Sequence, residues 1–239
     1  MNELKHAPYP QKRIFLPKKQ MQRYISELIG TFIMVFCGTG AIVMNDVSGG
    51  VVTHVGIALT FGLVVMAVIY ALGDLSGAHI NPAVTIAFWV AGRFNLKDVL
   101  PYITAQLIGA ILASALLYSL FPTHETLGAT EPLGEVLPSF VIEIILTFIL
   151  MFVIMKVSTG SKETGTMAGI AIGGVVALEA LFAGPITGAS MNPARSIAPA
   201  WLSGQTEYLW LYIAAPIIGA LIAVFACKAI KGKNCCPGC

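Results

Sequence analysis

The sequence predicts an all-α membrane protein in which six transmembrane helices and two re-entrant half-helices form two inverted repeats. Three observations lead to this fold class: the scarcity of charge, the lengths of the apolar segments and an internal repeat. Of the 239 residues, 56% are hydrophobic and only 11% are charged, and the mean hydropathy is +0.82. Soluble domains carry about 25% charged residues, so this chain could not cover a water-facing surface. The net charge of only +2 also argues against nucleic acid as a partner.

Six apolar segments are long enough to cross a bilayer, for which a helix needs about 20 residues. Turn-forming stretches separate these segments, among them Ser48-Gly49-Gly50 and Pro122-Thr123-His124. The expected spans are, in chain order, Tyr24–Met44, Val51–Leu72, Val99–Phe121, Val136–Val157, Met167–Ala183 and Leu209–Ile230.

Two further apolar segments, Asn81–Ala91 and Asn192–Leu202, are only 11 residues long. At about 1.5 Å per residue each would reach roughly 16 Å, or half of a bilayer. Both begin with Asn-Pro, and these residues are favoured at the cap and at the first position of a helix. We therefore expect two half-helices that enter the membrane without crossing it.

The positions of Lys and Arg predict the orientation, because basic residues collect in cytoplasmic loops. Of the 14 basic residues, all except Arg195 lie in the N-terminal tail, in the stretch before the third span, between the fourth and fifth spans, or after the sixth. With six spans, all of these segments fall on one side of the membrane. We therefore expect a multi-pass plasma (inner) membrane protein with both termini in the cytoplasm.

The chain also repeats itself at a spacing of 110 to 116 residues. The matched pairs are Glu27 with Glu143, Gly56 with Gly169, Ser76–Ala83 with Thr187–Ala194, and Tyr102 with Tyr212. Each copy holds three spans, an odd number, so the second copy lies inverted in the membrane. Inverted repeats place paired features around a pseudo-two-fold axis at the midplane, where the two Asn-Pro starts would meet.

Two half-helix N-termini at the midplane have an electrostatic consequence. Each carries the equivalent of about half a positive elementary charge. A cation or a hydronium ion would therefore meet a positive potential where it loses its hydration, whereas a neutral molecule would not. Asn81 and Asn192 could donate amide N–H groups to a passing oxygen while their carbonyl groups hold the local backbone.

The paired boxes Asn81-Pro82-Ala83 and Asn192-Pro193-Ala194, together with the six spans, resemble the aquaporin (major intrinsic protein) family over residues 23–230. The resemblance implies a right-handed bundle of six helices, a homotetramer in the lipid bilayer, and one pore per subunit with the two boxes as its motifs. It implies no cofactor, and no catalytic set of residues stands out, so we expect no enzymatic activity.

The same resemblance divides the chain into three parts. The channel domain covers residues 23–230, with the first repeat at about 23–121 and the second at about 136–230. A cytoplasmic tail at 1–22 precedes this domain, and a cysteine-containing cytoplasmic tail at 231–239 follows it.

In this family four residues line the narrowest point of the pore, on the outer side of the boxes. The resemblance places them at Phe61, Ala180, Ala189 and Arg195. A filter role would explain why Arg195 is the one basic residue outside the expected cytoplasmic segments. In that role Arg195 would offer fixed N–H donors to a solute oxygen and repel cations. A salt bridge to Glu207 is the alternative role for Arg195.

The expected filter departs from that of strict water channels, which usually have His at the position of Ala180. Ala180 and Ala189 are small and should widen the constriction. The segment Leu181–Met191 resembles the nodulin-26-like, aquaglyceroporin-type branch, whose members pass glycerol, urea or undissociated metalloid acids. Ser196 stands where typical glycerol facilitators carry Asp, and Phe61 is smaller than the Trp often found in that branch.

We therefore expect a passive channel for water and small uncharged solutes, which excludes protons and ions by half-helix dipoles and an arginine filter. A strict water channel is one alternative. An ion-coupled secondary transporter is another, because such transporters also use inverted repeats and broken helices.

Three acids lie inside the expected spans, where a carboxylate is costly and usually functional. The resemblance implies that Glu27 and Glu143 support the re-entrant loops by accepting hydrogen bonds from their backbone. Glu179 has no counterpart in the first repeat. It would either support the loop that holds Ala189 or line the pore.

Histidine and cysteine give weaker signals. His79 would line the inner vestibule or pack beside it, whereas His54 and His124 are expected to be solvated. No pair of histidines has metal-ligand spacing, so no resident metal is expected. Three clustered thiols in the C-terminal tail could bind a soft metal, or the tail could be solvated or lipidated; these thiols belong to Cys235, Cys236 and Cys239.

Overall fold

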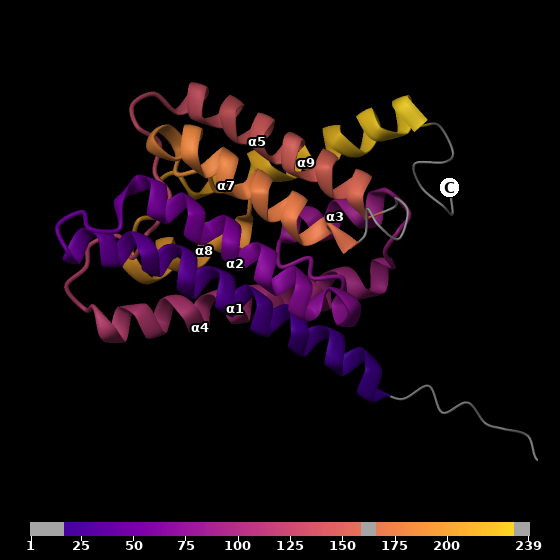
Figure 1. Ribbon diagram of the computed structural model, residues 1–239, viewed down its shortest axis with the longest axis horizontal. Helices are drawn as coiled ribbons and strands as arrows, with labels where there is room; N and C mark the ends of the chain where they lie inside the picture. The colour runs from indigo at the N-terminus through magenta and orange to yellow at the C-terminus, as the bar shows by residue number, and fades with distance from the viewer. Residues whose placement is uncertain (1–16, 159–165, 232–239) are drawn as a thin grey trace, which may run out of the picture.

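The computed structural model describes residues 17–158 and 166–231 (Figure 1). Within these ranges the chain is all-helical and contains no strand, which confirms the predicted fold class. The long helices are α1 (Pro17–Val47), α2 (Thr53–Ser76), α4 (Leu96–Leu120), α5 (Val136–Val157), α7 (Ala168–Thr187) and α9 (Leu209–Lys231), and the short ones are α3 (Pro82–Val90) and α8 (Pro193–Ser203).

α5 has the predicted bounds, but several of the other long helices extend past the apolar segments from which they were predicted. α1 begins at Pro17, ahead of the expected tail boundary at residue 23, and α7 continues to Thr187 instead of ending at Ala183. Hydropathy marks only the part of a helix that lies in hydrocarbon. The helix itself continues until a residue such as Gly188, at a left-handed φ of 80°, ends it.

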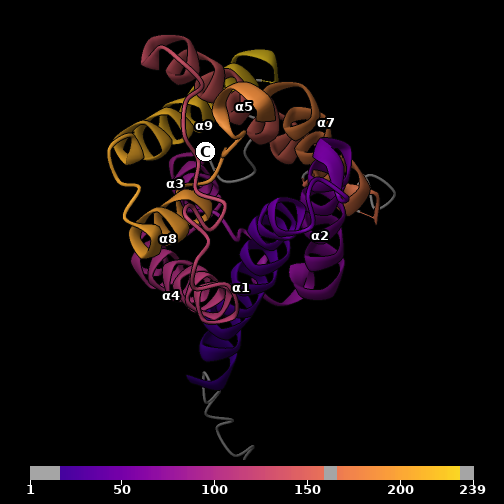
Figure 2. The same cartoon turned by 90° about the vertical axis from the view of Figure 1, so that its left-hand side faces the viewer.

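The two halves of the chain use the same helix contacts. α1 packs on α4 in the first half and α5 packs on α9 in the second, while α2 and α7 pack on each other where the halves meet (Figure 2). Gly62 and Gly173 permit that last crossing. A β-carbon on Gly62 would lie 2.6 Å from the Gly173 carbonyl oxygen, and one on Gly173 would lie 2.5 Å from that of Gly62. The half-helices α3 and α8 lie between α4 and α9.

Glycine also allows one close approach within each half. A β-carbon on Gly109 would overlap the carbonyl oxygen of Leu28, and one on Gly219 would overlap that of Ile144. Leu28 and Ile144 directly follow the paired acids in the sequence. The same tight helix crossing therefore occurs beside each acid.

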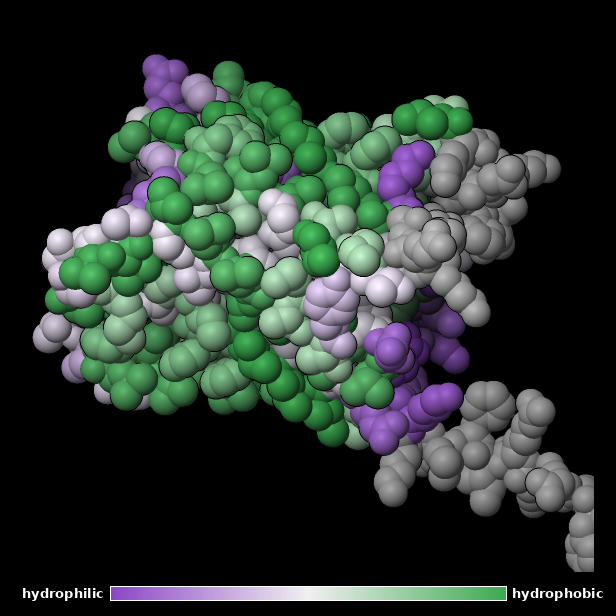
Figure 3. Space-filling model, viewed as in Figure 1, coloured by the Kyte–Doolittle hydropathy of each residue, from purple (hydrophilic) through white to green (hydrophobic). Residues whose placement is uncertain are grey.

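The outside of the bundle is apolar over its middle. Six helices among the described residues are long and apolar enough to cross a membrane. Large hydrophobic side chains remain exposed on them, such as Leu59, Leu112, Leu178 and Phe225, and Figure 3 shows the resulting apolar belt with hydrophilic side chains toward the ends. Soluble monomers rarely expose apolar patches of this extent. The protein is therefore a multi-pass membrane protein.

Two basic side chains form hydrogen bonds at one end of the bundle. Arg93 Nη1 donates to Ser158 Oγ at 3.1 Å, and Lys228 Nζ donates to the carbonyl oxygen of Val90 at 3.3 Å. α1 begins and α9 finishes at the same end of the molecule (Figure 1). This placement agrees with an even number of spans.

Candidate pore and selectivity filter

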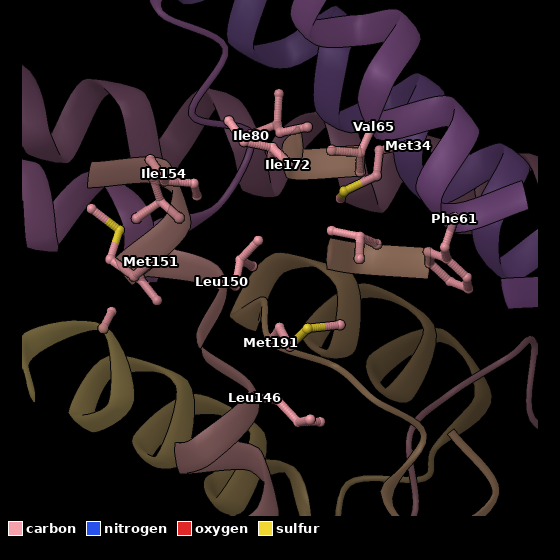
Figure 4. Packing of buried hydrophobic residues seen from close by; sticks show 14 of the residues in the cluster. Met34, Phe61, Val65, Ile80, Leu146, Leu150, Met151, Ile154, Ile172 and Met191 are labelled. Carbon is pink, nitrogen blue, oxygen red and sulfur yellow. The ribbon is translucent and has the colours of Figure 1, made fainter. Parts of the chain in front are cut away.

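A cavity of about 690 Å³ runs inside the bundle and is lined by residues from both halves of the chain. Most of its wall is apolar, and the lining residues labelled in Figure 4 are Met34, Phe61, Val65, Ile80, Leu150, Ile154, Ile172 and Met191. The lining also includes all four expected filter residues and the asparagines of both boxes. The fold thus brings site residues that are more than 100 positions apart in the sequence into one continuous space.

Each box asparagine holds its own half-helix and the opposite loop. Asn81 Oδ1 accepts the N–H of Ala83 at 2.8 Å, which caps α3, and Asn81 Nδ2 donates to the carbonyl oxygen of Met191 at 2.8 Å. Asn192 caps α8 in the same way and donates to the carbonyl oxygen of Ile80 at 2.8 Å. The two loops are therefore cross-linked by a reciprocal pair of hydrogen bonds.

This cross-link still leaves donors for a solute. An amide group has two N–H donors, so the cross-link leaves one on each asparagine. That of Asn192 donates to the sulfur of Met34 at 3.6 Å, a weak acceptor that a solute oxygen could replace. Because α3 and α8 both start at these asparagines, the positive ends of the two helix dipoles face the same part of the cavity.

The first re-entrant loop is held by Glu27, which is fully buried. Its Oε1 accepts from Ser76 Oγ at 2.7 Å and from the N–H of His79 at 2.9 Å. Its Oε2 accepts from the N–H of Ile80 at 2.7 Å and from Gln106 Nε2 at 2.8 Å. Four donors thus take the place of water around a buried carboxylate, which would otherwise be very costly.

Glu143 has the equivalent position behind the second loop. Its Oε1 accepts from Thr187 Oγ1 at 2.7 Å and from the N–H of Ser190 at 2.9 Å. Its Oε2 accepts from the N–H of Met191 at 2.9 Å. Both acids therefore make the backbone contacts expected of loop-supporting residues.

The backbone of the two loops has a strained alternation that sets the direction of its carbonyl groups. Four non-glycine residues have φ between 43° and 54°, in the left-handed region that is unfavourable for them: Ala78, Ile80, Ala189 and Met191. In a trans peptide the C=O points opposite to the N–H. Because the N–H of His79 faces Glu27, the carbonyl of Ala78 faces away from Glu27, and Ala78 lines the cavity. The carbonyl of Ala78 is thus directed away from the supporting acid, whereas those of Ile80 and Met191 accept from the opposite box asparagine.

Arg195 gives the expected filter its charge. Its guanidinium carbon lies 5.0 Å from the centre of the Phe61 ring, and its Nη1 donates to the carbonyl oxygen of Gly128 at 2.7 Å. A guanidinium stays protonated in proteins, so Arg195 places a fixed positive charge beside the cavity. Ala180 and Ala189 belong to the same lining, and their side chains are methyl groups.

Comparison with known proteins agrees with this geometry. Residues 16–227 match the family described as "Major intrinsic protein". The chain belongs to this family. It is 45% identical over 215 residues to aquaporin NIP1-1 of Zea mays, an alignment that covers 90% of this chain and 76% of that protein. It is 43% identical over 212 residues to nodulin-26 of Glycine max, covering 88% of this chain and 78% of that protein.

A solved structure gives the same result. The aquaglyceroporin from Plasmodium falciparum matches this structure with a TM-score of 0.78 at 26% sequence identity, covering 90% of this chain and 98% of that chain. These likenesses confirm the predicted family and the predicted resemblance to its nodulin-26-like branch.

One acid of this major intrinsic protein differs from the other two in its contacts among the described residues. Glu179 is fully buried on α7, and its two carboxyl oxygens have no hydrogen-bond partner among the described residues. It forms no hydrogen bond with the loop that holds Ala189, and it does not line the cavity, although its neighbour Ala180 does. Successive residues of an α-helix point about 100° apart, which accounts for the different surroundings of these two neighbours.

The contacts of Arg195 and His79 bear on the alternatives that the sequence leaves open for each. Arg195 binds Gly128, and the described contacts contain no ion pair between Arg195 and the exposed Glu207. His79 both lines the cavity and packs, because its ring stacks on Phe88 with centroids 4.8 Å apart.

His54 is exposed, as expected, and its Nε2 lies 2.7 Å from the carbonyl oxygen of Leu181. Pro185 has no N–H and cannot bond that carbonyl within α7, so His54 provides the missing partner next to Ala180. The expectation that His124 is solvated is wrong. The side chain of His124 is only 8% exposed.

Two residues of the site were not predicted from the sequence, and three predicted candidates lie outside the described residues. Gln106 was missed, although a polar side chain inside an expected span is a reason to look for a partner. Gly128 was missed because it lies in an irregular loop. Among the described residues no group of three metal-ligating side chains occurs. The three clustered thiols lie outside the described residues, at Cys235, Cys236 and Cys239.

Proposed function

We propose that this protein is a passive channel for water and small uncharged solutes such as glycerol, urea or undissociated metalloid acids. The observation that carries the proposal is the cavity itself, an apolar passage interrupted by hydrogen-bonding groups at Asn81, Asn192 and Arg195. A solute that sheds part of its hydration would bind these donors in turn. Such a path favours small polar molecules without charge.

The same groups oppose ions. The positive ends of α3 and α8 and the guanidinium of Arg195 raise the energy of any cation in the passage. Half-helix dipoles and an arginine are the devices attributed to aquaporin-type pores for excluding protons and cations. The roles of Phe61, Ala180, Ala189 and Arg195 as filter residues, and of Glu27 and Glu143 as loop supports, are part of this proposal.

A solute range beyond water is supported by two observations. The side chains of Ala180 and Ala189 add no bulky or polar group to the expected constriction. In addition, the relatives reported above include nodulin-26, and the structural neighbour is an aquaglyceroporin.

We further propose a homotetramer in the plasma (inner) membrane, with residues 23–230 as the channel domain and both termini in the cytoplasm. The cluster of basic contacts at the end where α1 begins and α9 finishes supports the orientation. Native mass spectrometry of the detergent-solubilised protein would test the tetramer, and a species with one, two or three chains would contradict it.

Substitution of Ala180 tests the proposed passage. In stopped-flow measurements on proteoliposomes, the unmodified protein should give water and glycerol fluxes that do not saturate and take up no protons. Ala180→Trp should lower glycerol flux about tenfold and water flux less, because overpacking a close-fitting site costs about 1–3 kcal/mol. Leu178→Trp is the matched control, since Leu178 is on the same helix and 57% exposed. Equal glycerol flux in the two variants would contradict the proposal.

A further inference from the structure

The loop between α4 and α5 fixes the position of Arg195 from outside the cavity. Its Gly128 carbonyl accepts the 2.7 Å hydrogen bond from Arg195 Nη1. Gly128 has a φ of 74° and the preceding Leu127 a φ of 52°, which is strained for a residue with a side chain. Such a conformation persists only where its surroundings enforce it.

His124 is one of the groups that enforce it. Its Nδ1 accepts the N–H of Leu127 at 3.0 Å and the N–H of Thr126 at 3.3 Å. A ring nitrogen that accepts hydrogen bonds carries no proton, so the proton of neutral His124 is on Nε2. Nε2 lies 3.2 Å from Oδ2 of Asp46 at the end of α1, at ion-pair distance but without the alignment of a hydrogen bond.

Further contacts clamp the loop between α1 and α8. The side chain of Leu127 is fully buried, and a β-carbon on Gly128 would lie 3.0 Å from the carbonyl oxygen of Thr39 on α1. Thr130 Oγ1 donates to Ser196 Oγ on α8 at 2.7 Å. The loop therefore has little room to shift as long as His124 closes the turn.

We propose that His124 is a positioning residue for the filter: it closes the turn that aims the Gly128 carbonyl at Arg195 and so holds the guanidinium at the wall of the cavity. This inference rests on the proposed function, since it takes Arg195 as a filter residue. Without the turn, the guanidinium would lose its fixed acceptor and extend toward water in the passage.

Two substitutions of His124 in the full chain, reconstituted in proteoliposomes, test the proposal. His124→Ala removes the acceptor and should lower the ratio of glycerol flux to water flux at least about threefold. The reason is that the opened turn no longer holds the Gly128 carbonyl at Arg195, so a hydrogen bond to a charged group is lost. His124→Asn should restore the ratio, since an asparagine oxygen accepts the N–H two residues further on in an Asx turn. A merely structural role would affect both variants alike, and that result would overturn the proposal.

Arg195→Val distinguishes failure of this inference from failure of the proposed function. If Arg195→Val leaves selectivity unchanged, the filter role of Arg195 fails and the inference fails with it. If Arg195→Val changes selectivity while His124→Ala does not, only the inference fails. If His124 acts through Arg195, the double variant should match Arg195→Val alone, and additive effects would overturn the positioning role.

Discussion

The two re-entrant loops are similar in sequence and backbone, but they differ in what surrounds them. Both are held by a buried glutamate, both have left-handed alanines, and both end in an asparagine that caps a half-helix. Three residues beyond that asparagine, the first repeat has Val84 and the second has Arg195, and both residues line the cavity. One copy of the motif therefore presents an apolar wall and the other a charge.

The groups behind the loops differ in the same way. Gln106 gives Glu27 a fourth donor, whereas the corresponding position of the second repeat is Pro216, which has no side-chain donor. The first loop also packs through His79 against a cluster of aromatic rings, which consists of Phe88, Phe94 and Tyr102. At the position of His79 the second loop has Ser190, whose hydroxyl is 2.6 Å from Ser196 Oγ.

This difference indicates that the two halves of the chain contribute differently to the channel. The features that the repeats share build the passage: the acid, the cap, the strained loop and the tight glycine crossing. If Arg195 acts as a filter residue, as proposed, the features that they do not share set the selectivity of the channel and the stability of each loop. Variants that lack a shared feature should therefore fail to fold. Variants that lack an unshared feature should fold, but with altered selectivity or stability.

The largest effect is expected from loss of the paired acids. Glu27→Ala and Glu143→Ala leave four and three buried donors without their acceptor. Each orphaned donor costs about 1–3 kcal/mol, so neither variant should give a folded channel, and Glu27→Ala should be the worse. Size-exclusion chromatography in detergent would measure this, with Glu131→Ala at an exposed loop position as the control. Normal elution of both variants would show that the protein folds without the two acids.

A smaller but functional effect is expected when the second half is made to resemble the first. Arg195→Val copies Val84 and removes the fixed charge, so proton leak should rise at least about tenfold, because one charge at a few ångströms is worth more than about 1.4 kcal/mol at intermediate dielectric. A pH-sensitive dye inside proteoliposomes would report it. Arg195→Lys keeps the charge and should remain proton-tight. A low leak in the valine variant would mean that the half-helices alone exclude protons.

The smallest effect is expected when the first half is made to resemble the second. Gln106→Leu removes the fourth donor to Glu27 and a 3.0 Å contact with Thr85 Oγ1. The variant should lose about 1 kcal/mol, which lowers the Tm in detergent by roughly 2–4 °C for a chain of this size, while water flux stays normal. Gln205→Leu at an exposed position is the control. A complete loss of folding would show that Gln106 belongs to the essential scaffold.

Much of the fold and part of the candidate site could be predicted from the sequence. Apolar length and helix caps are local properties, so the spans and the starts of α3 and α8 follow from them. The helix ends were placed less well, as at Pro17 and Thr187, because polar interface residues continue a helix without raising its hydropathy.

Contacts between distant segments were beyond the sequence. Gly128 and His124 lie in a loop without periodicity, and the hydrogen bond that joins Gly128 to Arg195 spans 67 positions. Glu179 shows the same limit, since one residue of helical register decides whether a side chain faces the cavity or the packing beside it.

The sequence by itself determined that this chain is a membrane protein, how many times it crosses the bilayer, and that its two halves are inverted copies. It could do so because hydrophobic length, charge bias and repetition are carried by residues close together in the chain. Only the tertiary structure decided which side chains meet at the centre: the asparagine of each half bonds the loop of the other, and the carbonyl of Gly128 accepts from Arg195. Such contacts depend on how helices far apart in the sequence are packed, and no local pattern records that packing.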